Sequence, residues 1–346
     1  MKIILFFSRI TLVLMLGFPV LVSAGGEVSV IYTEEVDGSE DAAVNQYSAD
    51  GNDYRWGVGR NLKITGFRYN DKDYDYRSVA NSVVIRRVDN DESTGERCAL
   101  FAERDGGNNR RFLSDYPDDG SGSGNCDMAE VMGGRIINRG VLDLFANAEN
   151  SYGSHKNIER VDFITSGGIV APTDADDLSE AGHVATEKSG NNPVQIAAIL
   201  SLDENGDPAE YGFLVMVNPA SNSCSGICYG ITNVSTTNSF VVNEDNPPHS
   251  GVYYTGNAST ESLGMAFISL EDLGIAAGQT YYGFSYFGTD VDADIHELTD
   301  PGSFPLNSEG QSSGGPGQAD VYGGTAGVFV EEDVEIEVPD PEDAGD

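Results

Sequence analysis

Basic residues are scarce in this chain, which has 19 Lys and Arg against 56 Asp and Glu and a formal net charge of −37 at pH 7. A polypeptide this acidic repels the phosphate backbone of nucleic acids and the anionic surface of membranes. Nucleic-acid binding is therefore excluded, and we expect the protein to stay soluble unless cations bridge its surface.

The motifs of common enzyme classes are missing as well. The histidines have neither the His-x-x-x-His nor the His-Glu-x-x-His spacing of zinc sites, and the chain has no Gly-x-Ser-x-Gly elbow and no P-loop. Pairs of carboxylates, which glycosidases use, are so numerous among 56 acids that they distinguish nothing. The sequence identifies no catalytic residue and favours a role other than catalysis.

Long hydrophobic runs are limited to TLVLMLGFPVLV at residues 11–22. This run follows two basic residues and precedes Ser23 and Ala24, the order typical of a signal peptide and its cleavage site. A retained membrane anchor is the weaker alternative, because the run is short for a bilayer and contains a proline. We expect residues 1–24 to be removed and the mature chain to begin near Gly25. The product would be secreted, to the cell exterior or the periplasm, without membrane insertion.

Cysteines number only four. In an exported chain an even number indicates disulfides, and proximity in the sequence favours Cys98–Cys126 and Cys224–Cys228 over the two other connectivities. The second pair encloses three residues, so it lacks the spacing of a Cys-x-x-Cys redox motif. Both bridges are therefore expected to be structural.

Clusters of Gly, Asn and Asp separate short runs rich in Val, Ile, Tyr and Phe, a pattern typical of β-strands joined by tight turns. The clearest hairpin joins the runs 195–203 and 211–217 around Asn205-Gly206. Short strands at this spacing predict an all-β protein, a β-sandwich or jelly roll with a few short helices. Further strands are expected at 27–32, 55–57, 62–69, 82–88, 227–234, 239–242, 251–255, 265–270, 280–287 and 321–330.

The segment Asn157–Val170 is expected to be the central core strand. Its apolar positions are rich in β-branched and aromatic residues, and Gly167-Gly168 is expected to end it in a tight turn. Short helices are predicted at 127–133, from a capping-box spacing, and at 139–147, where the apolar residues share one helical face. A capped helical turn is predicted at 269–274.

The mature chain is long enough for two β-rich halves, residues 25–168 and 169–330, or for one continuous domain that contains both. The tail, residues 331–346, is acidic and has no base. Its alternating stretch Val334–Val338 predicts an edge strand. The same stretch suggests, as a less favoured hypothesis, a strand donated to another copy of the protein.

Several acidic clusters place carboxylates at alternate positions of the chain, where they can converge on Ca²⁺. Neither of the two Asp-x-Asp-x-Asp runs is an EF-hand, because each lacks the glycine required at the sixth position. Ca²⁺ is the one cofactor that the sequence suggests, and solvated turns are the alternative. The best candidate ligands are Asp290, Asp292, Asp294 and Asp300, followed by Asp71, Asp73 and Asp75.

Three arginines, Arg135, Arg139 and Arg160, stand out in a chain with so few bases. A buried or half-buried arginine is held in place most effectively by a carboxylate. We therefore expect structural ion pairs with neighbours such as Asp143, Glu159 or Asp162, and no substrate anion at these positions.

Three phrases carry a resemblance to known proteins: NIERVDFI at 157–164 with the preceding Arg139-Gly140, PVQIAAILSLDENGDPAEYG at 193–212, and LEDLGIAAGQTYYGFSYFGTDV at 270–291. They resemble a recurrent β-rich module of secreted and surface proteins of bacteria, often found within adhesin-like or envelope-associated proteins. The resemblance covers roughly residues 85–330. It implies a location in or outside the envelope and a non-enzymatic role, and it supplies no site residues.

These observations predict a secreted, acidic all-β protein that acts by binding or assembly, as an adhesin-like or matrix component whose surface responds to divalent cations. Its partner would be an extracellular surface, a glycan, a protein or another copy of itself. Two alternatives are a structural polymer subunit and a secreted glycan hydrolase with Asp/Glu acid–base chemistry beside Trp56 or Tyr281-Tyr282.

Overall fold

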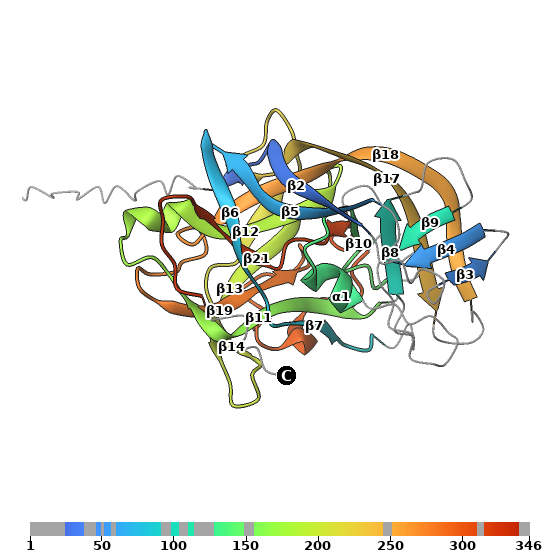
Figure 1. Ribbon diagram of the computed structural model, residues 1–346. Coiled ribbons are helices and arrows are strands. Elements are labelled where there is room, and N and C mark those ends of the chain that lie inside the picture. The colour runs from blue at the N-terminus through green and yellow to red at the C-terminus, as the bar shows by residue number, and fades with distance from the viewer. Residues whose placement is uncertain are drawn as a thin grey trace, which may run out of the picture.

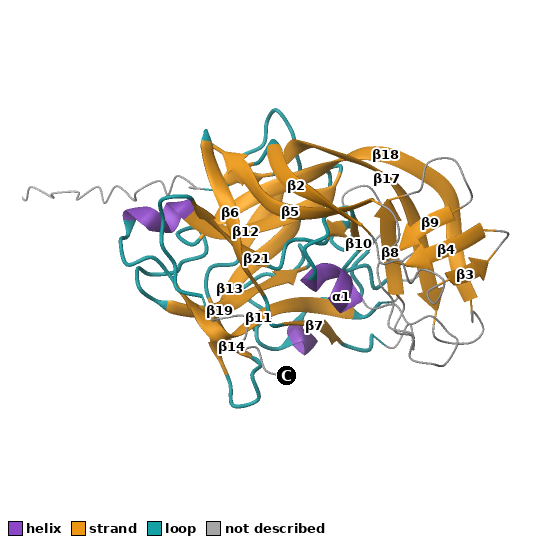
Figure 2. Cartoon of the chain, viewed as in Figure 1, coloured by secondary structure: helices purple, strands orange, loops and turns teal. Residues whose placement is uncertain are grey.

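The computed structural model describes residues 25–37, 46–49, 52–56, 60–90, 98–103, 110–113, 128–148, 156–244, 251–309 and 315–338. Within these ranges the chain forms 21 strands, one α-helix and two short 3-10 helices. The strands make curled, mostly antiparallel sheets (Figures 1 and 2), so the predicted all-β, sandwich-like fold is confirmed. The predicted signal peptide, residues 1–24, lies outside the described part. Among the described residues, no helix has the length and apolar character needed to cross a bilayer.

The largest sheet has eleven strands and curls strongly (Figure 1). Its long central hairpin, β17 and β18, runs across the molecule and continues well beyond the short strands expected there. In spatial order the sheet contains β2 (Val30–Asp37), β5 (Arg60–Tyr69), β6 (Lys72–Val79), β21 (Gly327–Glu331), β12 (Ala181–Lys188), β18 (Gly251–Ser269), β17 (Gly230–Glu244), β8 (Cys98–Glu103), β10 (Arg139–Val141) and β20 (Val321–Tyr322), with β1 (Gly26–Glu27) also paired to β18.

A second sheet of seven strands shares a hydrophobic core with the first, and a small three-stranded sheet is separate in its strand pairing but contacts β8. Both larger sheets take strands from before and after residue 168. The seven-stranded sheet contains β16 (Ile227–Cys228), β15 (Val215–Asn218), β13 (Val194–Leu202), β19 (Thr280–Phe287), β11 (Ile158–Val170) and β7 (Ser82–Arg87), with β14 (Pro208–Tyr211) beside β13. The small sheet contains β3 (Gln46–Ala49), β4 (Asn52–Trp56) and β9 (Arg110–Leu113).

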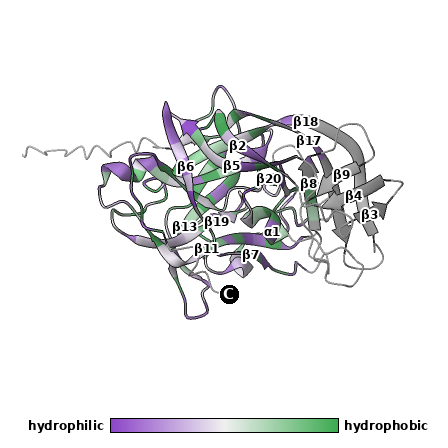
Figure 3. Cartoon of the chain, viewed as in Figure 1, coloured by the Kyte–Doolittle hydropathy of each residue, from purple (hydrophilic) through white to green (hydrophobic). Residues whose placement is uncertain are grey.

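Strand alternation divides the large sheet between two hydrophobic cores. In β21, Val328 and Val330 belong to the core shared with the second sheet, whereas Phe329 belongs to the core inside the curl. Phe163 and Phe284 stack with their ring centroids 4.5 Å apart in the shared core. Figure 3 shows the opposite character at the outer end of β6, which is hydrophilic. Alternate residues of a strand such as β21 therefore face different cores, so the strand is buried on both faces.

Asn233 joins two distant strands of the curled sheet. Its Oδ1 accepts a hydrogen bond from Ile31 N at 2.8 Å, and its Nδ2 donates to Ile31 O at 3.2 Å. The Asn233 N–H also donates to Ser29 O at 3.1 Å. An amide side chain thus takes the place of a strand partner for β2 and ties it to β17, which closes the curl.

We expect Asn233→Ala to destabilise the protein by about 1 kcal/mol, because both hydrogen bonds to Ile31 are lost. Amide hydrogen exchange at Ile31 should become faster, and urea unfolding should report the loss of stability. Asn233→Asp is the matched control: it keeps an acceptor for Ile31 N and should lose less protection there. Unchanged exchange at Ile31 in the alanine variant would contradict the closure.

Two local predictions are wrong. Gly167-Gly168 does not end the central strand: β11 continues to Val170 through an irregularity between Ile164 and Ile169, where Gly168 adopts φ +78°. The helix predicted at 139–147 is absent, since residues 139–141 form β10 between β8 and β20 and turns follow. A Cβ at Gly140 would lie 2.2 Å from Val321 O. Only glycine therefore lets β10 lie this close to β20.

Several other local predictions are confirmed. Helix α1 (Met128–Gly133) forms at the expected place, and a hairpin turns at Asn205-Gly206, although its second strand is β14 and the expected run 211–217 is interrupted before β15. At the predicted turn 269–274, Ser269 Oγ accepts from Asp272 N at 3.1 Å and Asp272 Oδ2 accepts from Ser269 N at 3.2 Å, the reciprocal geometry of a capping box. The 3-10 helices η1 (Asp176–Glu180) and η2 (Pro301–Ser303) complete the helical elements of the described residues.

The acidic tail is attached to the edge of the second sheet. Glu337 forms an isolated antiparallel bridge with Val170, with Val170 N donating to Glu337 O at 2.9 Å. Val334 is 8% exposed, and Ile336 and Val338 pack against the shared core. The segment therefore pairs within its own chain, and donation to another copy stays a hypothesis.

Candidate functional site

The acidic loop that follows β19 uses its carboxylates to hold its own turns. Asp292 Oδ1 accepts from Asp294 N at 2.9 Å, and Asp292 N donates to His296 Nδ1 at 2.9 Å. Asp300 Oδ1 accepts from Gly302 N at 3.0 Å and so caps η2. Asp290 bonds to a different segment: its Oδ2 accepts a hydrogen bond from Ser308 Oγ at 2.6 Å.

The second predicted cluster occupies the β5–β6 hairpin. Asp71 lies in the tight turn, with φ 61°, whereas Asp73 and Asp75 lie on β6. Arg68 holds Asp73 through two hydrogen bonds of 2.8 Å, and Tyr32 donates to the same carboxylate at 2.6 Å. These donors lower the pKa of Asp73 to about 2.

Within the part of the chain that the structure describes, no group of three or more His, Cys, Asp or Glu side chains is placed to hold a metal ion. The two predicted clusters are thus arranged mainly as turn and ion-pair residues. Calcium binding stays a prediction.

Arg160 and Asp162 form the predicted ion pair, and it is the centre of a larger network. Arg160 Nε lies 2.6 Å from Asp162 Oδ1, with side-chain exposures of 3% and 0%. Arg86 Nε donates to Asp162 Oδ2 at 2.7 Å, and Ser285 Oγ donates to Oδ1 at 2.7 Å. Tyr211 OH donates to the same oxygen at 3.3 Å. Both arginines converge on one buried carboxylate, so the network fastens β7, β11, β14 and β19 together.

The other predicted ion-pair residues have different surroundings. Arg135 donates to Ile64 O at 2.7 Å, and its guanidinium lies 3.9 Å from the centre of the Tyr76 ring. Arg139 is buried in β10, where its carbonyl accepts from Gly323 N at 2.7 Å. At Asp143 the nearby base is a lysine, and it contacts the backbone: Lys156 Nζ donates to the backbone carbonyl of Asp143 at 2.7 Å.

A carboxyl cluster formed by the buried Glu187 and the half-buried Asp143 and Asp320 was not anticipated from the sequence. Asp143 N donates to Asp320 Oδ1 at 2.8 Å, and Asn191 N donates to Glu187 Oε2 at 2.8 Å. Glu187 is 0% exposed, and its Oε1 is buried without a hydrogen-bond partner. No spacing rule could have found the cluster, since its members lie on three separate segments.

Electrostatics in this carboxyl cluster favour the protonated state. Burial raises the pKa of Asp143 and of Glu187, and in both cases the charge of Asp320 adds to the effect. Burial also raises the pKa of Asp320, although Lys188 opposes the shift. Lys188 Nζ in turn forms an ion pair with Glu261 Oε2 at 3.0 Å. The cluster therefore retains protons at pH values at which ordinary carboxyls are ionised.

Glu159 is a second buried carboxyl that the sequence did not reveal as unusual. It is 4% exposed, and its Oε1 accepts from Asn147 Nδ2 at 2.7 Å. Burial, reinforced by the charge of Asp290, raises the pKa of Glu159 to about 8. A carboxyl group in this state is neutral under mildly acidic conditions and becomes charged under mildly alkaline ones.

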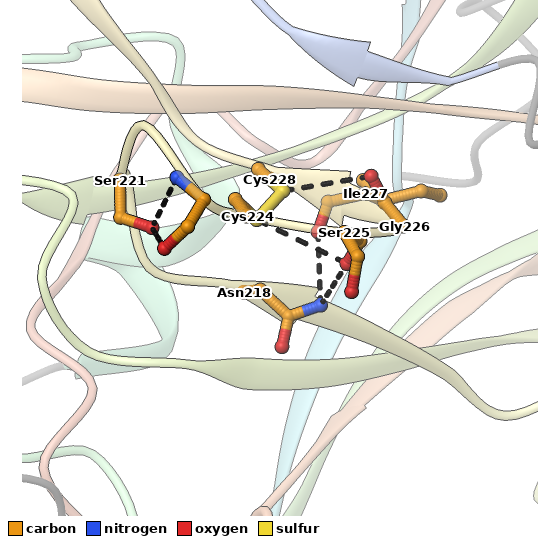
Figure 4. The surroundings of a disulfide bond; sticks show 8 residues. Asn218, Ser221, Cys224, Ser225, Gly226, Ile227 and Cys228 are labelled. Atoms are coloured by element: carbon orange, nitrogen blue, oxygen red, sulfur yellow. Dashed lines mark hydrogen bonds between the residues drawn. A yellow bond between two sulfur atoms is a disulfide. The ribbon is translucent and has the colours of Figure 1, made fainter.

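One of the two predicted disulfides is present in the described residues. Cys224 and Cys228 are bonded, with their Cα atoms 6.4 Å apart, and close the short loop between β15 and β16 (Figure 4). Asn218 Nδ2 donates to Ser225 O and Ile227 O, each at 3.3 Å, from below this loop. Cys126 lies outside the described residues, so the Cys98–Cys126 bridge stays a prediction.

Of the aromatic residues proposed as alternatives beside a glycan site, Tyr281 is buried in the core. Tyr281 is 0% exposed, and its hydroxyl lies 3.2 Å from His183 Nε2. Burial lowers the pKa of His183 to about 4, so this imidazole is a neutral core residue. Trp56 ends β4, and its side chain lies outside the described part.

A scan against protein-family models finds no match for this chain, and searches of curated proteins and of solved structures find none either. The resemblance to an adhesin-like module therefore stays an expectation.

Proposed function

We propose that this chain is a secreted binding and assembly protein of the cell exterior, and that divalent cations bridge its acidic surface to its partners. The proposal is supported by how the few bases are used. Within the described ranges, seven of them form ion pairs with acids of the same chain: Lys63, Arg68, Lys72, Arg77, Arg86, Arg160 and Lys188. These bases are engaged within the chain, whereas the acids outnumber all bases by 37.

The surplus of negative charge lies at the surface, in loops and turns. Asp174, Asp176, Asp292 and Asp294 are all exposed. Two such surfaces repel each other in water, and the repulsion extends over about 8 Å at physiological ionic strength. A divalent cation shared between carboxylates removes this barrier, which suits a protein that joins acidic glycans, acidic proteins or other copies of itself.

Self-association should therefore depend on the kind of cation and not only on ionic strength. We expect static light scattering to show a larger average mass in millimolar CaCl₂ than in NaCl of equal ionic strength, and EDTA should reverse the change. Asp292→Asn with Asp294→Asn should weaken the calcium response. Asp174→Asn with Asp176→Asn removes the same charge from another part of this acidic surface and should weaken the response by a similar amount. Equal masses in calcium and sodium would contradict the proposal.

The glycan-hydrolase alternative receives less support from the same contacts. The charge of Asp290 helps to raise the pKa of Glu159 to about 8, a value that would suit a general acid. However, Glu159 is 4% exposed and bonded to Asn147, which leaves little access for a sugar. The binding role is therefore the function that the described geometry supports best.

A further inference from the structure

The nitrogen of Gly25 lies against a carboxylate that is held in a fixed position. Gly25 N donates to Asp272 Oδ2 at 2.7 Å, across 247 residues of sequence. The same Oδ2 accepts from Ser269 N at 3.2 Å and from Ser269 Oγ at 2.6 Å. Asp272 N in turn donates to Ser269 Oγ at 3.1 Å, so the capped turn after β18 orients the carboxylate toward Gly25.

Residue 25 has no room for a side chain. Gly25 is buried, and a Cβ on it would lie 2.3 Å from Phe267 O and 2.8 Å from Asp272 Oδ2. The next residue already pairs in β1, with Gly26 opposite Phe267 on β18. Residue 25 is therefore the point where the chain joins the large sheet beside β18, and its nitrogen is the atom that reaches the carboxylate.

This position coincides with the cleavage site predicted from the sequence, where Ala24 precedes Gly25. In the unprocessed chain the Gly25 nitrogen is an uncharged peptide amide. Hydrolysis of the Ala24–Gly25 bond by a signal peptidase adds one water, leaves a carboxylate on Ala24 and turns the Gly25 nitrogen into an ammonium group. A charged donor makes a stronger hydrogen bond to a carboxylate than an amide does.

We propose that the Ala24–Gly25 bond is the processing site and that the new α-ammonium group of Gly25 forms an ion pair with Asp272, which locks β1 onto β18. The inference rests on the export that the proposed function includes. Processing thus strengthens the attachment of β1 to the large sheet, because it turns the donor beside Asp272 from a neutral amide into a positive charge.

A four-protein comparison tests the ion pair in vitro. Two chains begin at Gly25, one with Asp272 and one with Asp272→Asn, and two others retain Ser23-Ala24 ahead of Gly25 in the same two backgrounds. All strands, helices and contacts described above lie within residues 25–338. With Asp272, retention of the two residues should shift the urea unfolding equilibrium at least tenfold toward the unfolded state. With Asp272→Asn, the shift should be less than twofold.

Two further measurements keep the proposal open to refutation. Acetylation of the chain that begins at Gly25 removes the charge without retaining Ser23 or Ala24, and it should reproduce most of the tenfold shift in the Asp272 background. Equal stability of the acetylated and free forms would overturn the ion pair. Mass spectrometry of the exported protein should find Gly25 as the first residue, and any other first residue would overturn the processing site. Neither result depends on calcium, so their failure is separable from failure of the assembly proposal.

Discussion

Asp162→Asn should destabilise the protein by about 3–5 kcal/mol, the cost of leaving a buried charge without its partner. Asp162 is 0% exposed and accepts hydrogen bonds from Arg160, Arg86 and Ser285. An asparagine keeps the size of the side chain but offers no charge to the buried guanidinium of Arg160. Urea unfolding at pH 7 should therefore show a much lower midpoint with an unchanged slope.

The control for this variant is Asp207→Asn. Asp207 also pairs with Arg86, but its side chain is 49% exposed, so water can replace the lost partner. We expect a loss of no more than about 1 kcal/mol, as is typical of exposed ion pairs. If the two variants lost similar stability, the charge at Asp162 would not be what holds β7, β11, β14 and β19 together.

The second large effect concerns pH. The pKa of Glu159 is about 8 in the folded protein, well above the ordinary glutamate value that applies to the unfolded chain. Between these two values the folded state binds more protons, so stability is greatest at low pH within this window and falls as the pH rises through the folded pKa. We expect the wild-type protein to lose about 2–4 kcal/mol between pH 5 and pH 9 from this group. The raised pKa values of Asp143 and Glu187 act in the same direction.

Glu159→Gln removes the titration and should flatten this profile. The variant should be close to the wild type at pH 5 and more stable than the wild type at pH 9, because a neutral amide needs no proton to remain buried. Glu204→Gln, in the exposed turn of the β13–β14 hairpin, is the matched control and should leave the slope unchanged. Parallel profiles for wild type and Glu159→Gln in urea unfolding from pH 5 to pH 9 would refute the prediction.

Local patterns were reliable where the backbone follows from neighbouring residues. The Asn205-Gly206 turn, helix α1 and the capping box at Ser269 and Asp272 all depend on contacts within a few residues, and all form as predicted. The error at residues 139–147 has a different cause. Val141, Leu144 and Phe145 are all buried, as their spacing suggested, but flanking strands from distant parts of the chain decide that residues 139–141 are extended.

The sequence alone determined the acidic character of the protein, the β-rich class and the Cys224–Cys228 bridge, because composition, alternation and turn residues act locally. Tertiary structure alone decided which charges matter. It placed two arginines on Asp162, brought Asp143, Glu187 and Asp320 together from three segments, and set Gly25 against Asp272. Burial and long-range proximity fix the energy of a charge, and neither quantity is encoded in the spacing of residues along the chain.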